Sequence, residues 1–90
     1  MKFTVIWTPV AERELAELWL AADDKAEVTR VSQAVERQLK IDPEHAGESR
    51  VGPIRLLLEP PLGFVFSVSP DDRLVKVVHV VRARRKKADP

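Results

Sequence analysis

The sequence predicts a single α+β domain in which an N-terminal strand and a helix hairpin precede a three-stranded antiparallel meander. Apolar residues recur at helical spacing between residues 9 and 42, whereas β-branched and aromatic residues gather before and after that range. A chain of 90 residues builds one modest hydrophobic core and has no room for a second. We therefore expect one domain, residues 1–90, whose strands form one sheet with both helices on one face.

The first expected strand, residues 2–8, leads directly into the first helix. Its apolar side chains alternate, as they do in a strand with one buried face. Thr8 can accept a hydrogen bond from a free helical amide, and Pro9 suits the first helical position because that position needs no N–H donor. A helix therefore begins at this point.

A second helix follows the first and forms a hairpin with it. Asp24 and Glu27 have the spacing of a capping box, which starts the second helix. The Asp42-Pro43 step ends it, because a residue before proline is disfavoured in the α region. The apolar face of the hairpin consists of Ala11, Leu15, Leu18, Ala22, Val28, Val31, Val35 and Leu39.

Three strands, residues 53–59, 62–69 and 74–82, make up the expected meander. The segment Ser-Pro-Asp-Asp-Arg, residues 69–73, is a turn, because proline fixes φ and aspartate bonds its local backbone. The last strand contains five valines within residues 74–81 and suits a central, packed position.

The loops between these strands set the expected register. If the turn pairs Ser69 with Leu74, Phe64 lies opposite His79, and a three-residue loop before the middle strand pairs Phe64 with Leu56. His79 then belongs to the helix-covered face, as a core or half-buried residue. The other members of that face are Ile54, Leu58, Leu62, Phe66, Val68, Val75 and Val77.

The opposite face follows by alternation along each strand. It places Arg55, Lys76 and Arg82 on a floor of small or apolar side chains, as a shallow groove that no helix covers. Phosphate is the expected ligand for three such cations. Alternatively, each cation pairs with a carboxylate, and the carboxylates available for this are Glu48, Glu59 and Asp72.

A basic tail, residues 83–90, follows the last strand. We expect this tail to be disordered, as chain ends without packing partners often are. Two interpretations of its charge stay open, a solvated terminus and a segment that binds phosphate.

Composition excludes several kinds of site. With 15 basic and 14 acidic residues the net charge is +1, so affinity for nucleic acid depends on how the charges are distributed. The absence of cysteine excludes disulfides, thiolate zinc sites and thiol nucleophiles. Two histidines without ligand spacing predict neither a metal site nor another cofactor. No segment resembles a signal peptide or a membrane span, which predicts a cytoplasmic protein without a membrane partner.

Four segments of the chain share a residue pattern with one family. They are FTVIWTPVAERELAELW, LKIDPEHAGESR, GPIRLLLEPPLGFVFSV and DDRLVKVVHVVRARR, and they cover nearly the whole chain. In residue type and spacing they resemble the RelE/ParE superfamily of type II toxins. The resemblance implies a toxin that a cognate antitoxin neutralises. RelE-like members bind messenger RNA in the ribosome on an open sheet face and cleave it, whereas ParE-like members inhibit DNA gyrase.

The resemblance also implies roles for the basic residues. RelE-like members stabilise phosphate charge with arginines and lysines. Arg55 and Arg82 match two basic positions of the family, so we expect them to neutralise the scissile phosphate as catalytic residues. The residues expected to bind RNA are Arg50, Lys76, Arg84 and Arg85.

Two departures from the family pattern bear on catalysis. The aromatic–arginine pair that begins the family's third strand is Leu62-Gly63 here, and the chain has no tyrosine. RNA cleavage needs groups that take and give a proton, and the candidates are His79, Glu48 or a lysine. Three functions therefore stay open: an endoribonuclease that cuts messenger RNA on the ribosome, a non-catalytic gyrase inhibitor of the ParE kind, and a relic that only binds an antitoxin.

Overall fold

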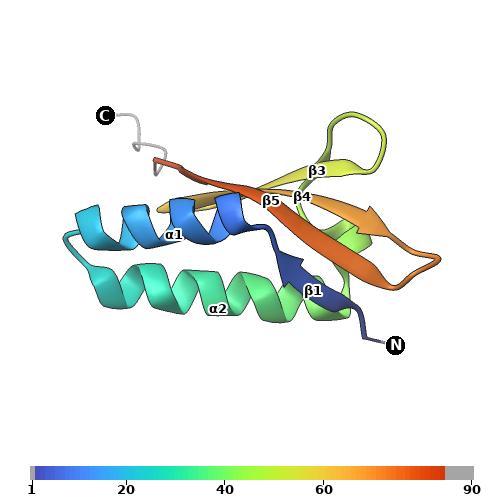
Figure 1. Cartoon of the computed structure of the whole chain (residues 1–90), viewed down its shortest axis with the longest axis horizontal. Coiled ribbons are helices and arrows are strands. Elements are labelled where there is room, and N and C mark those ends of the chain that lie inside the picture. Colours follow the sequence, from blue (N-terminus) through green and yellow to red (C-terminus); the bar gives the residue numbers. More distant parts are fainter. Residues whose placement is uncertain (1, 85–90) are drawn as a thin grey trace, which may run out of the picture.

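The computed structural model describes residues 2–84, which form two α-helices and a five-stranded mixed sheet (Figure 1). Most of the predicted basic tail, including Arg85, lies outside the described residues. In chain order the elements are β1 (Thr4–Trp7), α1 (Pro9–Ala21), α2 (Lys25–Ile41), the short 3-10 helix η1 (Pro43–His45), β2 (Glu48–Ser49), β3 (Ile54–Glu59), β4 (Leu62–Ser69) and β5 (Leu74–Arg82).

The strand order in the sheet is β1-β5-β4-β3-β2, so that β5 has a neighbour on each side. β1 runs parallel to β5, and the other neighbouring strands are antiparallel. Both helices pack on the same side of this sheet (Figure 1). The predicted α+β class with two helices is confirmed. The description as one strand plus a three-stranded meander was incomplete, because the short strand β2 adds a fifth member at the edge beside β3.

Both helices begin at the residues that the sequence predicts. Thr8 Oγ1 accepts a hydrogen bond from the Ala11 amide at 3.1 Å, and Pro9 is the first residue of α1. At the start of α2, Asp24 Oδ1 accepts a hydrogen bond from the Glu27 amide at 2.9 Å. Each cap satisfies an amide that has no partner inside its helix. The two helix starts therefore follow from local sequence.

The core lies between the helices and the sheet. Phe64 and Phe66 of β4 are fully buried, and Trp7 packs edge-on against Phe64 with ring centroids 6.2 Å apart. The Trp7 indole N–H donates to Glu36 Oε1 at 2.8 Å, which satisfies the polar end of this ring at the margin of the core. The other buried apolar residues of the core are Phe3, Ala11, Val28, Val35, Leu39, Ala46, Leu57, Leu62, Val68, Val75, Val77 and Val80.

The pairing of β3 with β4 differs from the prediction by one residue. Phe64 lies opposite Leu57 rather than Leu56, because the connecting loop contains two residues instead of three. A shift of one residue exchanges the two faces of a strand. Arg55 therefore points toward the helix-covered side, and the predicted orientation of its side chain is wrong. The residues that move to the opposite face are Ile54, Leu56 and Leu58.

A β-bulge changes the second register. The pairing of β4 with β5 follows the prediction as far as Phe66 opposite Val77, and beyond this point Val78 is an extra residue in β5. A bulge of this kind turns the following side chains to the other face of the strand. His79 consequently lies on the uncovered face, so its prediction as a core or half-buried residue of the helix-covered face is wrong. By the same shift, Arg82 points toward the helix side.

Candidate functional site

The uncovered side of the sheet is the surface on which the sequence predicts a binding groove. We call it the open face, and its members are Thr4, Ile6, Glu48, Ile54, Leu56, Leu58, Gly63, Val65, Ser67, Ser69, Leu74, Lys76, His79 and Val81. Within residues 2–84, its basic side chains are Lys76 and His79, both in β5. Lys76 is exposed and lies between Ile6 and Ser67 of the neighbouring strands. The open face is therefore mainly apolar, with a small basic centre.

Arg55 lies on the other side of the sheet and holds a loop. Its Nε donates to the Ala46 carbonyl at 2.9 Å, and its Nη2 donates to the Gly47 carbonyl at 3.1 Å. The chain is tight here, because Gly47 has a φ of +66° and a Cβ at this position would collide with the Leu56 carbonyl. The prediction that Arg55 shares a groove with Lys76 is wrong. Its observed partners are backbone carbonyls rather than a carboxylate.

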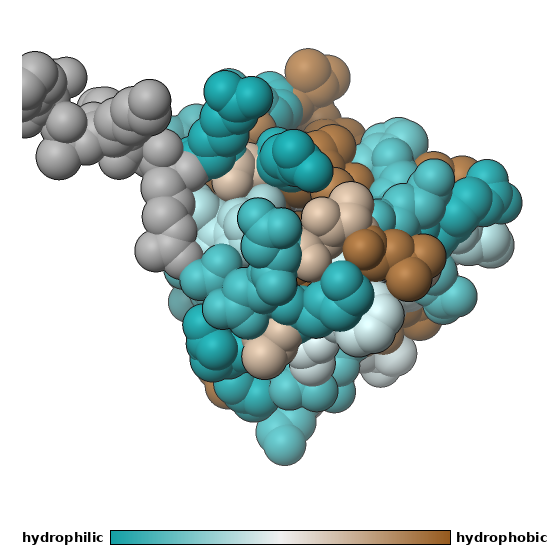
Figure 2. Space-filling view, turned by 90° about the vertical axis from the view of Figure 1, so that its left-hand side faces the viewer, coloured by the Kyte–Doolittle hydropathy of each residue, from teal (hydrophilic) through white to brown (hydrophobic). Residues whose placement is uncertain are grey.

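Arg82 also faces the helix side, at the far end of β5. It lines a hollow of about 500 Å³ beside the turn between α1 and α2. Other residues that line this hollow are Leu18, Asp23, Asp24, Glu27, Leu62 and Arg84. Figure 2 views the molecule from this end, where the surface is mainly hydrophilic. Arg82 thus has acidic groups near it and is separated from Lys76, so the predicted groove of three cations does not form.

The described residues among those predicted to bind RNA are dispersed. Arg50 follows β2, and its Nη2 lies 3.4 Å from Glu48 Oε2. Lys76 is on the open face, Arg84 is exposed just after β5, and Arg85 lies outside the described residues. The structure does not bring Arg50, Lys76 and Arg84 together at one place, and the contact of all four residues with RNA stays a prediction.

Gly63 occupies the open-face position where the family pattern has an arginine. A Cβ at Gly63 would lie 3.0 Å from Leu58 Cδ2 and 3.0 Å from Val81 Cγ2. These two side chains close over the glycine although both are partly exposed. The open face is consequently apolar where RelE-like members are expected to carry a cation.

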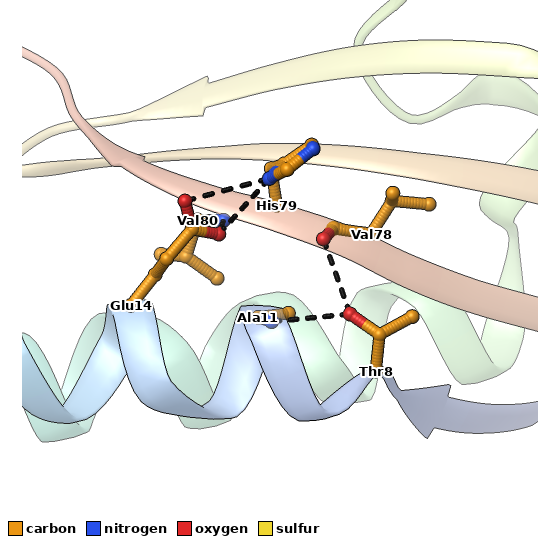
Figure 3. A network of polar contacts seen from close by, with 6 residues as sticks. All are labelled: Thr8, Ala11, Glu14, Val78, His79 and Val80. Atoms are coloured by element: carbon orange, nitrogen blue, oxygen red, sulfur yellow. Dashed lines mark hydrogen bonds and ion pairs between the residues drawn. The ribbon is translucent and has the colours of Figure 1, made fainter.

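Glu14 of α1 reaches across the edge of β5 to His79 (Figure 3). Glu14 Oε1 lies 3.1 Å from His79 Nδ1 and also accepts a hydrogen bond from the Val80 amide at 3.1 Å. At the N-cap of α1, Thr8 Oγ1 donates to the Val78 carbonyl at 3.1 Å. β1 ends before this part of β5, so side chains at the start of α1 satisfy backbone groups that have no strand beside them.

The arrangement of His79 suits proton transfer. A carboxylate accepts hydrogen bonds and cannot donate them, so Nδ1 of the neutral imidazole carries the proton and Nε2 presents a lone pair. The side chain of His79 is 50% exposed, whereas that of Glu14 is 31% exposed. The ring is thus held by a partly shielded carboxylate, and its Nε2 points away from Glu14 (Figure 3).

The sequence predicted His79 as a core or half-buried residue, although it also counted His79 among the candidates for proton transfer, and it missed Glu14 as its partner. One signal was available, since the first predicted strand is shorter than the last. Half of the last strand must then find edge partners elsewhere, and the start of the first helix is the nearest source in the fold. Which helical residue supplies those partners depends on the three-dimensional path of α1.

The remaining ionisable groups of residues 2–84 define no second site of this kind. His45 Nδ1 lies 2.8 Å from Asp42 Oδ1 in the loop after α2, where both side chains are exposed. Within residues 2–84, no three histidine or acidic side chains lie close enough together to hold a metal ion. Across the same range, neither helix combines the length and apolar character needed to cross a membrane.

No protein-family model matches the sequence, and no curated protein matches it either. Solved structures do match. A chain of the RelBE2 toxin–antitoxin complex from Mycobacterium tuberculosis has a TM-score of 0.75 at 16% identity, covering 92% of this chain and 100% of that chain. A chain of the chromosomal ParDE system from P. aeruginosa has a TM-score of 0.67 at 18% identity, covering 91% of this chain and 97% of that one.

The intact E. coli RelBE toxin–antitoxin complex contributes a third match, with a TM-score of 0.64 at 17% identity over 94% of this chain and 100% of that chain. The class that these structures define is a small α+β domain found in toxin–antitoxin complexes. This chain shares its fold with these chains of RelBE and ParDE complexes, which is the fold that the sequence resemblance predicted.

Proposed function

We propose that this chain is the toxin component of a type II toxin–antitoxin pair, and that its open face binds and cleaves messenger RNA in the ribosome. The observation that carries the proposal is the likeness of fold to chains of RelBE and ParDE complexes over almost the full length of each chain. The uncovered sheet, with Lys76 exposed at its centre, offers a surface for a phosphate backbone. The proposed site of action is the cytoplasm, where ribosomes work.

Basic residues around the open face would supply the remaining charge. Lys76 would contact the phosphate nearest to His79, and Arg50 would contact the backbone beside β2. Arg84 is exposed just after β5 and would contact the RNA where it leaves the open face, whereas Arg82 faces the helix side. Arg85 is proposed to add to this charge from outside the described residues. We propose a structural role for Arg55, because it holds the loop through the Ala46 and Gly47 carbonyls.

Ribosomes programmed with a defined message provide the direct test. The purified chain is expected to cut the message in the A site and to leave the same RNA intact without ribosomes. Lys76→Ala should weaken cutting, whereas Arg37→Ala, which removes an exposed cation from α2, should not. An intact message under conditions where a RelE toxin cuts it would reject the enzymatic proposal.

A cognate antitoxin is the proposed partner. The matching chains come from complexes that are named for a toxin and an antitoxin. Expression of this chain alone should arrest growth, and co-expression of the small protein encoded next to it should restore growth and yield a complex. Tight binding of that protein without any growth defect would instead indicate a relic.

The second candidate function is inhibition of DNA gyrase without catalysis. The closure of Gly63 by Leu58 and Val81 favours it, because an apolar surface suits a protein partner better than RNA. In supercoiling assays the chain would then block gyrase at concentrations that leave ribosome-bound messages intact.

A further inference from the structure

We propose that His79 is the proton-accepting catalytic residue of the open face and that Glu14 is its positioning residue. The inference rests on the proposed cleavage of RNA and adds the group that activates the nucleophile. His79 acts on a ribose 2′-hydroxyl beside a phosphodiester, which binds on the open face next to Nε2 of His79.

The tertiary structure holds Glu14 in place. Its Oε1 accepts a hydrogen bond from the Val80 amide at 3.1 Å and lies 3.1 Å from Nδ1 of His79, which is 65 residues away in the chain. The pair of His45 and Asp42 differs, because its members are only three residues apart and their side chains are 83% and 57% exposed. The Glu14–His79 pair is therefore a product of the fold, whereas the other pair is a local surface contact.

The bulge at Val78 directs His79 outward. Without the extra residue, alternation along β5 would turn the imidazole toward the core. Bulges are frequent next to active sites, where they re-aim a side chain. The bond to Val80 alone would protect the strand edge, yet the same carboxylate also lies 3.1 Å from Nδ1 of His79. This second contact fixes the orientation of the imidazole, which proton transfer requires.

The chemical step balances with water as the only added reactant. Nε2 of His79 takes the proton of the 2′-hydroxyl while the 2′-oxygen forms a bond to phosphorus. The bond between phosphorus and the 5′-oxygen breaks, and water gives that oxygen a proton. The hydroxide that remains takes the proton from Nε2 of the imidazolium, which returns His79 to its neutral form. The products are a 2′,3′-cyclic phosphate and a 5′-hydroxyl. Glu14 stabilises the imidazolium that forms, and Lys76, three residues earlier in β5, offsets charge on the phosphate.

The first test measures the tautomer of His79 in the full chain by proton–nitrogen correlation NMR of the imidazole. In the wild type, the neutral ring should carry its proton on Nδ1. Glu14→Gln can keep the bond to Val80 through its carbonyl oxygen, but its amide group would donate to Nδ1 and leave the ring proton on Nε2. Asp42→Asn is the control, and it should alter His45 alone. A neutral His79 that carries its proton on Nε2 in the wild type would overturn the proposal.

The second test compares single-turnover cleavage of ribosome-bound messages. His79→Gln and Glu14→Gln should each lower the rate about 10²-fold or more. His45→Gln and Asp42→Asn should cut at the wild-type rate. A message with a single 2′-deoxyribose at the cut site should stay intact. Unfolding midpoints close to that of the wild type would exclude loss of fold as the cause.

The outcomes separate the two proposals. If the wild type cuts no message, both the proposed function and the role of His79 are rejected. If the wild type cuts and His79→Gln cuts equally fast, the function stands and the role of His79 is rejected. If Glu14→Gln retains the wild-type rate after the tautomer has changed, the positioning role of Glu14 is rejected.

Discussion

The two halves of β5 obtain their edge hydrogen bonds from different sources. From Leu74 to Val77, the strand runs beside β1 in regular parallel register. From Val78 onward, its edge faces α1, where Thr8 bonds to the Val78 carbonyl and Glu14 bonds to the Val80 amide. One strand thus has a backbone neighbour along its first half and a side-chain neighbour along its second.

The difference between the halves shows where a central strand can carry functional groups. Along the first half, Val75 and Val77 have no exposed surface and serve the core. Along the second half, a carboxylate that satisfies a backbone amide also lies beside an imidazole, and the bulge brings that imidazole outward. Buried backbone groups need partners in either case. When a side chain is the partner, it can serve a second group as well.

The largest expected effect is on the first half of β5. Val77→Ala should lower the free energy of unfolding by about 2 kcal/mol, because it removes buried methyl groups and leaves a cavity. Val78→Ala, at the half-buried bulge, should cost less than about 1 kcal/mol. Urea unfolding measures both. Equal losses would show that the two halves of the strand do not differ in packing.

Thr8 joins the two halves, since it caps α1 and also bonds to the Val78 carbonyl. Thr8→Ala should lower the free energy of unfolding by about 1–2 kcal/mol, because both hydrogen bonds are lost. Thr8→Ser keeps the hydroxyl and should stay within about 0.5 kcal/mol of the wild type. A serine variant as unstable as the alanine variant would assign the effect to the lost methyl group.

Substitutions of Glu14 test whether its side chain protects the edge of the second half of β5. Glu14→Ala should cost about 1 kcal/mol, because the Val80 amide loses its partner at a partly exposed position. Hydrogen exchange of that amide should become about fivefold faster, in line with this loss. Glu14→Gln should exchange at nearly the wild-type rate, since its carbonyl oxygen can accept the same bond. Unchanged exchange in the alanine variant would show that the edge does not depend on Glu14.

Lys76 should have the smallest effect on stability and a clear effect on binding. Lys76→Ala should change the free energy of unfolding by less than about 0.5 kcal/mol, because its side chain is exposed. RNA binding should weaken. The slope of the logarithm of the binding constant against the logarithm of the salt concentration should fall by about one, as expected for the loss of one phosphate contact. Titrations with RNA at several salt concentrations measure this, with Arg37→Ala as the control. An unchanged salt dependence would remove Lys76 from the RNA site.

The elements of this chain follow from local patterns. Thr8 and Asp24 cap the helices where the sequence predicts them, because a cap depends on residues within one turn. The three strands of the meander lie close to their predicted bounds, since apolar and β-branched composition marks them directly. The two-residue strand β2 has no such composition and depends on its pairing with β3.

The candidate site was less predictable than the helices and strands, because it depends on which face of its strand each side chain occupies. A shorter loop before β4 turned Arg55 to the helix side, and a bulge in β5 turned His79 to the open face and Arg82 to the helix side. Each change moves a strand by a single residue, which is enough to exchange its faces. Residue type alone therefore identified the basic side chains but misassigned their surroundings.

The sequence by itself determined the α+β class, the helix starts and the likeness to the RelE/ParE superfamily, because these depend on spacing along the chain. Only the tertiary structure decided which side chains share a surface, since that depends on register, on one bulge and on the path of α1. Glu14 and His79 illustrate the division. They are 65 residues apart, and it is the unpaired edge of β5 that brings them together.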